Sequence, residues 1–295
     1  MGRIVIGTSS WADQGFIDEW YPPGLARRDL LAHYAGHFDG VEVNSTFYGV
    51  PGTATVRRWV QQTPEGFRFD WKLHRLLSRH AGALDSLPGD LRDDVDTTPK
   101  GRVRLDDDLE LELVRRTLAA AAPLAEAGRL SSFLLQLTPA FVPPKHELDE
   151  LAGLVEALAP HPVAIEVRHR AWLSREHLEA TLGWLEEHGA AFVGVDAPQG
   201  KPATMLPPVD AVTLPELAYL RAHGRNAHGW VHGRSVAERF GHRYDDAELG
   251  EITGRAQALA EEAQEVRLMF NNNRGSDAPV AAQRARELLG QAVAA

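Results

Sequence analysis

The stretch Val163–Arg168 reads VAIEVR, an apolar and partly β-branched run that contains two charged residues, Glu166 and Arg168. A short apolar run of this kind is typical of a strand in a parallel sheet, which is buried on both faces. Helical periodicity precedes it over Lys145–Leu158 and follows it over Arg175–His188. The stretch is therefore expected to be the strand of a helix–strand–helix unit, and the same alternation extends over the whole chain.

Eight runs of this kind are spaced along the sequence: Arg3–Gly7, Gly40–Asn44, Phe67–Lys72, Ser132–Leu137, Val163–Arg168, Ala191–Asp196, Ala218–His223 and Val266–Asn271. Further helical stretches lie at Asp29–His37, Thr53–Thr63, Leu109–Ala127, Asp246–Ala263 and Pro279–Leu289. Strands that alternate with helices form right-handed βαβ units and a parallel sheet. Eight repeats in 295 residues fit a closed (β/α)8 barrel, and the first run lacks the G-x-G-x-x-G turn of a nucleotide-binding open sheet. The sequence therefore predicts one α/β domain, a TIM-type barrel spanning residues 1–295.

Composition restricts the kinds of function. The chain has 44% hydrophobic and 24% charged residues, in the proportions of a soluble globular protein. It contains no cysteine, which excludes disulfides, cysteine-bound zinc, iron–sulfur clusters and thiol catalysis. Its formal net charge of −10 disfavours indiscriminate binding to nucleic acid. The N-terminal residues MGRIVIGTSSWAD contain only a short apolar run, so we expect a cytoplasmic protein with no signal segment and no membrane partner.

Two connections are longer than the rest. Gly82–Asp108, between the third and fourth predicted strands, is rich in Asp, Pro, Gly and Thr and has few apolar side chains to bury. We expect this insertion to be exposed and poorly ordered, either as a solvated loop or as a lid over the functional site. Deletion of residues 89–104 is accordingly expected to leave thermal stability nearly unchanged. The second connection, Gly224–Asp246, is expected to lie over the same rim as the end of the seventh strand.

Charged and polar side chains occupy the predicted strands and their carboxyl ends, where the active sites of TIM-type barrels lie. Buried charge is costly unless it is paired or faces a wet cavity, so these side chains predict a common site at the mouth of the barrel. We expect three of them to be catalytic: Glu42, Lys72 and Glu166. The expected substrate-binding residues are Trp11, Asn44, Tyr48, His74, Gln136, Arg168, His169, Trp172, Asp196, Arg221, His223 and Asn272.

The types of the three catalytic candidates indicate their chemistry. Glu42 and Glu166 lie on the second and fifth strands, and two carboxylates that face each other across a substrate suit acid/base or glycosidic chemistry. The alternative for Glu166 is a structural pair with Arg168. Lys72 can react as a Schiff-base nucleophile or a proton shuttle if burial lowers its pKa. Neighbouring glutamates oppose such a shift, which favours an anion or hydroxyl clamp.

A divalent metal is an alternative, because four candidates are of the types that bind Mg or Mn in sugar isomerases: Glu42, Glu166, Asp196 and His223. Three cations of the same ring would compete with a metal for the carboxylates, namely Lys72, Arg168 and Arg221, so we expect no cofactor. The pairs His33/His37 and His228/His232 have i, i+4 spacing but lack the glutamate of an H-E-x-x-H zinc site. They are interpreted as surface histidines.

An anionic substrate is a second use for the cations, because Arg168 and Arg221 can each hold a carboxylate or phosphate in a bidentate manner. The last loop, NNNRGSDAP, places Gly275 and Ser276 before a helix that begins near Asp277. Its backbone N–H groups suit an anion, although an ordinary helix cap has the same sequence pattern. Aromatic residues at the same rim suit sugar rings, or else packing of the loops: Trp11, Phe47, Tyr48 and Trp172.

Seven segments together resemble a known family. They are EVNSTFYGVP, FDWKLHR, LLQLTPAF, AIEVRHRAW, FVGVDAP, YLRAHGR and FNNNRGSDAPVAA. In order and spacing they are similar to the signatures of the DUF72 (YecE-like) family, over nearly the whole chain apart from the insertion. The resemblance implies a TIM-type barrel and no established activity, and the family's label as related to sugar isomerases is an analogy of fold. This chain departs from the family in the insertion and in VDAPQGKPAT after the sixth strand.

The function expected from these observations is enzymatic. We expect isomerase- or lyase-like proton transfer on a small polar or anionic substrate such as a sugar or sugar phosphate. Glu42 or Glu166 is expected to be the base, with Arg168, Arg221 and Asn272 orienting the substrate. One alternative is phosphodiester or glycosidic hydrolysis, and another is a barrel that binds nucleic acid or carbohydrate without turnover. Nucleic acid is the less expected partner, and the sequence leaves the oligomeric state open.

Overall fold

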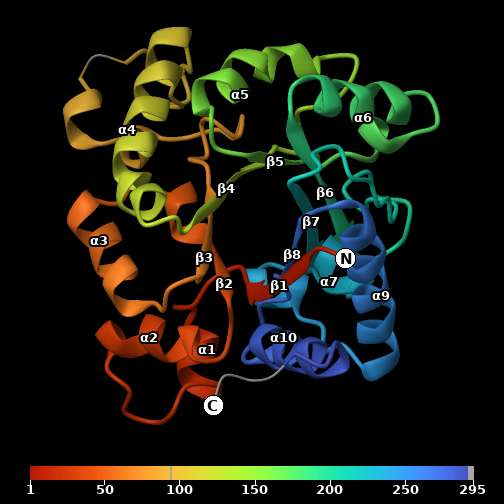
Figure 1. The fold of residues 1–295 in the computed structure, drawn as a ribbon. Coiled ribbons are helices and arrows are strands. Elements are labelled where there is room, and N and C mark those ends of the chain that lie inside the picture. The colour runs from red at the N-terminus through yellow and green to blue at the C-terminus, as the bar shows by residue number, and fades with distance from the viewer. Residues whose placement is uncertain (94, 292–295) are drawn as a thin grey trace.

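The computed structural model describes residues 1–93 and 95–291, in which eight strands form a ring with helices around it (Figure 1). The strands are β1 (Arg3–Thr8), β2 (Gly40–Val43), β3 (Arg68–Lys72), β4 (Leu130–Gln136), β5 (Val163–Glu166), β6 (Ala190–Asp196), β7 (Leu217–Ala222) and β8 (Glu265–Phe270). All neighbouring strands that pair are parallel, in the order β1-β8-β7-β6-β5-β4-β3-β2. Each of the eight predicted runs contributes one strand, so the predicted TIM-type barrel is confirmed.

The described residues form ten α-helices, most of which lie outside the ring (Figure 1). They are α1 (Gln14–Glu19), α2 (Leu30–Ala35), α3 (Thr53–Gln62), α4 (Asp107–Glu126), α5 (Ala152–Leu158), α6 (Leu178–Glu187), α7 (Ala227–His232), α8 (Val236–Phe240), α9 (Asp246–Glu262) and α10 (Asp277–Leu288). Carboxylates fix several of their first turns. Asp106 accepts a hydrogen bond from the Leu109 N–H at the start of α4, and Asp245 and Glu248 form a reciprocal capping box on α9. No helix of the described residues has the length and apolarity needed to cross a membrane.

The ring closes differently between β1 and β2, where the described residues form no backbone ladder. The two strands touch through glycines, because a side chain on Gly7 would collide with the Gly40 carbonyl. The hydroxyl of Tyr34 from α2 lies between them. It accepts a hydrogen bond from the Thr8 N–H at 2.8 Å and lies 3.2 Å from the Gly40 carbonyl oxygen, to which it can donate. A side chain thus provides the polar link that backbone pairing provides at the other seven strand boundaries.

Replacement of Tyr34 by phenylalanine is expected to destabilise the protein by about 1–3 kcal/mol, because it leaves buried backbone groups of Thr8 and Gly40 without their partner. Urea unfolding followed by circular dichroism measures the change. Tyr48→Phe is the matched control, because Tyr48 is 67% exposed and its loss of a hydroxyl should cost almost nothing. Equal stabilities for the two variants would show that the Tyr34 hydroxyl does not join the strands.

Side chains that point into the ring form layers. An apolar layer is built from Leu134, Ala164, Val193, Tyr219 and Met269. Closer to the amino ends of the strands, Arg267 and Asp70 form a fully buried ion pair with Nη2 and Oδ2 2.6 Å apart, and the Ser132 hydroxyl donates to Asp70 at 2.8 Å. A second set of charges lies at the carboxyl ends. In each set the cation is paired with carboxylates, Arg267 with Asp70 in the first and Arg221 with Glu42 and Glu166 in the second.

The insertion is more folded than the sequence predicts. Most of its residues are exposed, as expected, but Leu87 and Val103 are buried. Two short 3-10 helices, Leu84–Ser86 and Gly89–Leu91, and antiparallel bridges at Ala83–Arg102 and Thr97–Val103 shape it. It is joined to α4 by a bidentate pair between Arg116 and Asp90. The expectation of a poorly ordered loop is therefore wrong. Since deletion of residues 89–104 would remove the buried Val103, we expect that deletion to lower the melting temperature.

Leu87 tests how firmly the insertion is packed. Leu87→Ala is expected to cost about 2–4 kcal/mol, because the side chain is 2% exposed and its removal leaves a cavity. Leu111→Ala is the control, since Leu111 is 62% exposed and should cost less than about 0.5 kcal/mol. Chemical denaturation of both variants gives the comparison. A similarly small loss of stability in Leu87→Ala would instead support the solvated loop that the sequence predicts.

Candidate functional site

A cluster of charges lies at the carboxyl ends of β2, β5 and β7, and Arg221 is at its centre. Arg221 follows Tyr219 on the inward face of β7 and is fully buried. Its Nε and Nη2 donate to the Glu42 carboxylate at 2.8 and 2.6 Å, and its Nη1 donates to Glu166. One guanidinium therefore joins carboxylates from β2 and β5. We call Glu42, Glu166, Arg168, Arg221 and His223 the charged cluster.

Glu166 receives hydrogen bonds from four side chains. Besides Arg221, its carboxylate lies 2.8 Å from Arg168 Nη1, 3.0 Å from Gln136 Nε2 and 3.1 Å from His223 Nε2. Burial by itself would raise the pKa of Glu166, but Arg221, then His223 and Arg168, outweigh it and hold that pKa well below its usual range. Glu166 is therefore ionised at neutral pH. A carboxylate held in this way is a weak base and a poor proton donor.

Glu42 has a partner that the sequence analysis did not identify. The Tyr219 hydroxyl donates to Glu42 Oε2 at 3.1 Å, and both side chains are buried. Burial, followed by the negative charges of Asp70 and Glu42, raises the pKa of Tyr219 well above its usual value. Tyr219 thus stays a neutral donor. Its position could have been found from the alternation of β7, because Tyr219, Arg221 and His223 occupy the same face.

His223 is held as a neutral ring. The Asn271 amide nitrogen lies 2.9 Å from Nδ1, and Glu166 lies against Nε2. With that amide donating to Nδ1, the ring proton resides on Nε2 and is donated to Glu166. Burial lowers the pKa of His223 to about 4, against the opposing charge of Glu166. His223 is thus uncharged at neutral pH and serves to orient Glu166.

Lys72 differs from its neighbours because its amine contacts an aromatic ring and no carboxylate among the described residues. It is the last residue of β3, and its residue surface is 7% exposed. Its Nζ lies 4.7 Å from the centre of the Phe47 ring, and within residues 1–93 and 95–291 it has no hydrogen-bond or ion-pair acceptor. Burial, aided by the charge of Arg221 and opposed by Glu42 and Glu166, lowers the pKa of Lys72 to about 7. The glutamates do not prevent the shift, contrary to the expectation from the sequence.

Arg168 and Arg221 have different roles in the cluster. Each of the three nitrogens of Arg221 donates to a carboxylate of the cluster and Arg221 is fully buried, so its main role is to join Glu42 and Glu166. Arg168 donates to Glu166 through Nη1 only, and its Nε and Nη2 have no acceptor in the described part of the chain. The Arg168 guanidinium lies 5.5 Å from the Trp230 ring, and its side chain is 13% exposed. Arg168 is therefore the cluster's available donor for an anion.

Several predicted site residues pack the loops instead. His74 lies against the insertion, with Nε2 3.0 Å from the Ser86 carbonyl oxygen, because β3 ends at Lys72 and the strand alternation stops there. The His169 ring accepts from the Ala171 N–H at the start of a 3-10 helix. Trp172 is buried, donates to the Phe141 carbonyl at 2.8 Å and stacks on that ring. These three residues do not join the charged cluster.

Two further predictions fail because of strand register. On β6 the inward residues include Ala191 and Val193, so Asp196 points outward. There Asp196 is bound by Arg225 at 2.8 Å and by the Tyr244 hydroxyl at 2.8 Å. Asn272 likewise points away from the ring and donates to the His242 carbonyl at 2.8 Å. Its neighbour Asn271 takes the place in the cluster that was predicted for Asn272.

The remaining candidates lie around the rim. Asn44 follows β2 and is half-buried, and its side-chain oxygen is buried without a hydrogen-bond partner among the described residues. Tyr48 is exposed and contacts Phe47 edge to face at 5.2 Å. Trp11 is half-buried against Trp59 from α3 at 5.3 Å. Of these, Asn44 has a buried polar atom free for a ligand.

The residues that a metal would need are not brought together. Asp196 lies outside the cluster, and Glu42 and Glu166 are each paired with Arg221. Within the described residues no group of three His, Asp or Glu side chains is arranged to hold a metal ion. His228 and His232 are exposed, as predicted. His33 and His37 are half-buried against Trp20, so their interpretation as surface residues is wrong.

The start of α10 is occupied by a carboxylate of the protein itself. The Ser276 N–H and hydroxyl donate to Glu19 Oε2 at 2.9 and 3.2 Å. Gly275 has a positive φ of 53°, and a side chain there would collide with the Glu19 carboxylate. Glu19 thus takes the place that a substrate anion was expected to occupy in this loop.

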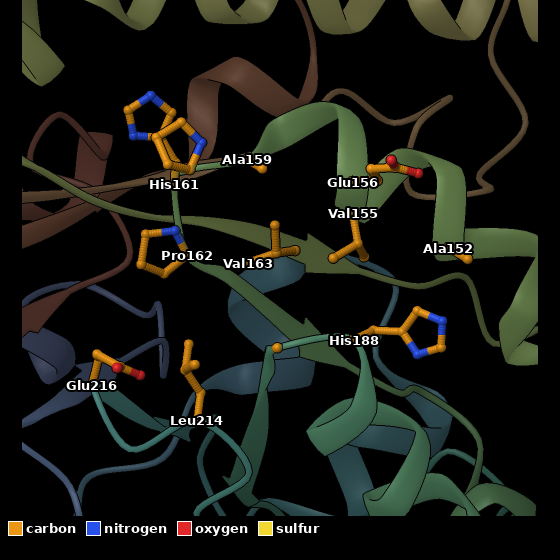
Figure 2. A pocket seen from close by; sticks show the side chains of 12 residues that line it. Ala152, Val155, Glu156, Ala159, His161, Pro162, Val163, His188, Leu214 and Glu216 are labelled. Carbon is orange, nitrogen blue, oxygen red and sulfur yellow. The ribbon is translucent and has the colours of Figure 1, made fainter.

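A groove of about 700 Å³ lies at the other end of the barrel (Figure 2). It is lined by residues 159–163, 188–189, 214 and 216, which lie at or just before the starts of β5, β6 and β7, and by part of α5. Figure 2 shows Val155, Val163 and Leu214 among its walls, with Glu156 and Glu216 at the edges. The charged cluster does not contribute to it. Since TIM-type barrels carry out chemistry at the carboxyl ends of their strands, we do not place the site in this groove.

The fold and the cluster together define the class of protein: a (β/α)8 barrel with paired, buried charges at the carboxyl ends of its strands. Residues 5–295 match the family described as "Protein of unknown function DUF72". The chain belongs to this family, which confirms the resemblance noted from the sequence motifs.

Known relatives carry similar descriptions. UPF0759 protein YunF of Bacillus subtilis (strain 168) is 28% identical over 290 residues, 97% of this chain and 94% of YunF. UPF0759 protein YecE of Escherichia coli (strain K12) is 30% identical over 200 residues, 66% of this chain and 59% of YecE. A solved DUF72 family protein from Enterococcus faecalis V583 has a TM-score of 0.77 at 27% identity, over 99% of both chains. Another, from Thermotoga maritima MSB8, has a TM-score of 0.78 at 24% identity, over 98% of this chain and 99% of that one.

Arg168→Met tests the division of roles within the cluster. We expect the pKa of Glu166 to rise toward its usual value and the affinity for inorganic phosphate to fall by about 10-fold or more, the worth of one charged hydrogen bond. Carbon NMR of labelled glutamate and calorimetric titration measure the two effects. Arg170→Met is the control, because Arg170 is exposed and donates to the Gly200 carbonyl. If the affinity for phosphate is unchanged in Arg168→Met, Arg168 does not bind the anion.

Proposed function

We propose that this protein is an enzyme that promotes proton transfer at the carbon next to a carbonyl group of a small, polar, anionic substrate, with Lys72 as its reactive amine. The observation that carries this proposal is the amine of Lys72, which is buried beside the charged cluster yet has no protein acceptor within the described residues. Buried cations are otherwise costly, and in this protein Arg221 and Arg267 are both paired. An unpaired buried amine supports a chemical role.

The protonation states favour Lys72 over the glutamates. A pKa near 7 gives Lys72 comparable populations of the neutral and charged forms at neutral pH, which suits proton transfer and nucleophilic attack. Glu166 is fixed as an anion by the cations around it, so the role of base or acid first expected of Glu166 fits poorly. Instead, Glu42 and Glu166 hold Arg221 in place and supply negative charge close to the amine. That charge stabilises a cation formed at Lys72.

The surroundings of Lys72 indicate the class of substrate. Arg168 has two guanidinium nitrogens free for a carboxylate or phosphate. Asn44 has an unpartnered side-chain oxygen, which suits a hydroxyl group. The carboxylates and Arg221 fill the ring beneath, so a ligand is restricted to the mouth. A hydroxycarbonyl compound with an anionic end, such as a sugar phosphate, matches this set. A glycosidase fits less well, because Glu166 cannot act as the protonated acid such chemistry needs.

Hydrogen exchange tests the proposal without knowledge of the physiological reaction. The protein is incubated in D2O with dihydroxyacetone phosphate, glyceraldehyde 3-phosphate and fructose 6-phosphate, and proton NMR follows loss of the signal next to the carbonyl. We expect exchange with at least one compound, and a decrease of about 100-fold or more in Lys72→Met. Lys201→Met is the matched control, because Lys201 is exposed.

The exchange rate of the wild-type protein is expected to rise with pH through about 7, because the lone pair of Lys72 becomes available as the amine loses its proton. Exchange that persists in Lys72→Met would contradict the proposal. Binding of these compounds without exchange would instead favour a barrel that binds carbohydrate and does not turn it over.

A further inference from the structure

We propose that the Lys72 amine forms a Schiff base with the carbonyl carbon of its substrate, an aldehyde or ketone whose anionic end is held by Arg168. This inference rests on the proposed function and deepens it, because it assigns the amine a covalent role. The chain has 27 arginines and only four lysines, at positions 72, 100, 145 and 201. Lys100, Lys145 and Lys201 are exposed, so Lys72 is the only buried lysine.

The use of lysine at position 72 has a chemical consequence. Where this protein buries a cation for ion pairing, it uses arginine, as Arg221 with Glu42 and Arg267 with Asp70 show. Arginine stays protonated in proteins and has no nucleophilic lone pair, whereas a lysine in a suitable environment does. Lys72 makes no ion pair in the described part of the chain. Its side chain therefore offers what arginine cannot, an amine that can form a bond to carbon.

The local structure holds the amine in position. The Thr46 hydroxyl lies 2.6 Å from the carbonyl oxygens of both Lys72 and Val43, which joins the end of β3 to the segment that follows β2. The Phe47 ring forms an apolar wall beside the amine. These contacts fix the backbone from which the Lys72 side chain extends and place a ring beside Nζ, while within the described residues Nζ has no acceptor. A nucleophile that is restrained but not hydrogen-bonded loses little on binding a substrate.

The reaction balances without any further reagent. The lone pair of the neutral amine attacks the carbonyl carbon, and a C–N bond forms as the carbonyl oxygen takes a proton. The C–O bond then breaks, and both protons of the amine leave with that oxygen as water, giving an imine. When the imine is protonated, its positive charge lies near Glu42 and Glu166, which stabilise it. The protonated imine withdraws electrons from the adjacent C–H bond, whose proton passes to water at the mouth, so that hydrogen exchange follows.

Reductive trapping in the wild-type protein tests the inference, because it needs no variant to fold. The protein is treated with sodium cyanoborohydride and pyruvate, dihydroxyacetone phosphate or uncharged glycolaldehyde at pH 7, and peptide mass spectrometry locates the reduced adduct. The exposed lysines are internal controls. At pH 7 about half of Lys72 is neutral, against about one in a thousand for an ordinary lysine, so we expect at least 10-fold faster labelling at Lys72.

Variants separate the two parts of the inference. Arg168→Met is expected to slow labelling by pyruvate and dihydroxyacetone phosphate about 10-fold more than labelling by glycolaldehyde, because loss of the Arg168 charge also raises the pKa of Lys72 and so slows all three probes to some extent. An equal effect on all three probes would overturn the assignment of Arg168. Labelling of Lys72 no faster than that of the exposed lysines would overturn the Schiff base. If hydrogen exchange then still requires Lys72, the proposed function stands with the amine as a base. An adduct at Lys72 without exchange would support the Schiff base and contradict the proposed function.

Discussion

Replacement of Arg221 by methionine is expected to lower the free energy of unfolding by about 3–5 kcal/mol at pH 7, because it leaves Glu42 and Glu166 buried without their shared cation. When one partner of a buried pair is removed, the remaining charges stay buried in an environment that solvates them poorly. The control is Arg284→Met, which removes exposed ion pairs to Asp246 and Glu287 and should cost less than about 1 kcal/mol. Equal losses in the two variants would show that the cluster contributes no more than surface charge.

The loss is expected to depend on pH in a defined direction. In the wild-type protein the pKa of Glu166 is lower when folded than when unfolded, so the carboxylate stabilises the fold above the unfolded pKa and loses this effect as the pH falls. Without Arg221 the folded pKa rises. Because the unfolded chain titrates alike in both proteins, the difference in stability should be largest near pH 7 and shrink as the pH falls through the range between the raised folded pKa of Glu166 in the variant and its lower folded pKa in the wild type. Urea titrations at several pH values measure this, and a difference that grew on acidification would contradict it.

Arg267 and Asp70, the other buried pair, are expected to show strong non-additivity. Arg267→Met should cost about 3–5 kcal/mol because the fully buried Asp70 loses its partner. Asp70→Val should also destabilise, since it leaves the guanidinium buried. The double variant should be more stable than either single one, because apolar side chains then continue the layer of Leu134, Ala164 and Met269.

Unfolding in guanidinium chloride of the four proteins gives the coupling energy, and the expected value is about 3 kcal/mol. Additive losses would show that the two residues act independently. Such a result would also remove the argument that charges in this barrel are tolerated only as pairs.

Strand alternation made part of the candidate site predictable. Glu42, Glu166 and Arg221 are charged residues within apolar runs that form strands. Both faces of a strand in a parallel barrel are buried, so these charges have no solvated face on which to lie. Their meeting inside the ring therefore follows from the sequence pattern alone. The same rule gives the correct inward residue of β8. Arg267, Met269 and Asn271 share a face, so the alternation of β8, continued one residue past its end, predicts Asn271 and not Asn272 as the inward residue.

Other features depend on where each strand ends and on which donors meet, which the sequence does not state. His74 is two residues after Lys72 and was expected on the same face, but the chain leaves β3 at Lys72 and turns toward the insertion. The low pKa of Glu166 depends on Arg221, His223 and Arg168, whose side chains converge on one carboxylate from the ends of two strands. The sequence likewise does not show which cations pair with which carboxylates. The structure gives these pairs, and only then can the amine of Lys72 be seen to lack a carboxylate partner among the described residues.

The connection that Arg221 makes between β2 and β5 also bears on how the barrel is assembled. Glu42, Glu166 and Arg221 come from the first, middle and last thirds of the chain, so no half-barrel made of four consecutive repeats contains all three. In a partly formed ring these charges would be separated and hydrated, and burying them there would be unfavourable. Their pairing therefore stabilises the complete ring relative to compact half-barrels. The residues that surround the proposed reactive amine thus also favour all-or-none assembly of the chain that carries them.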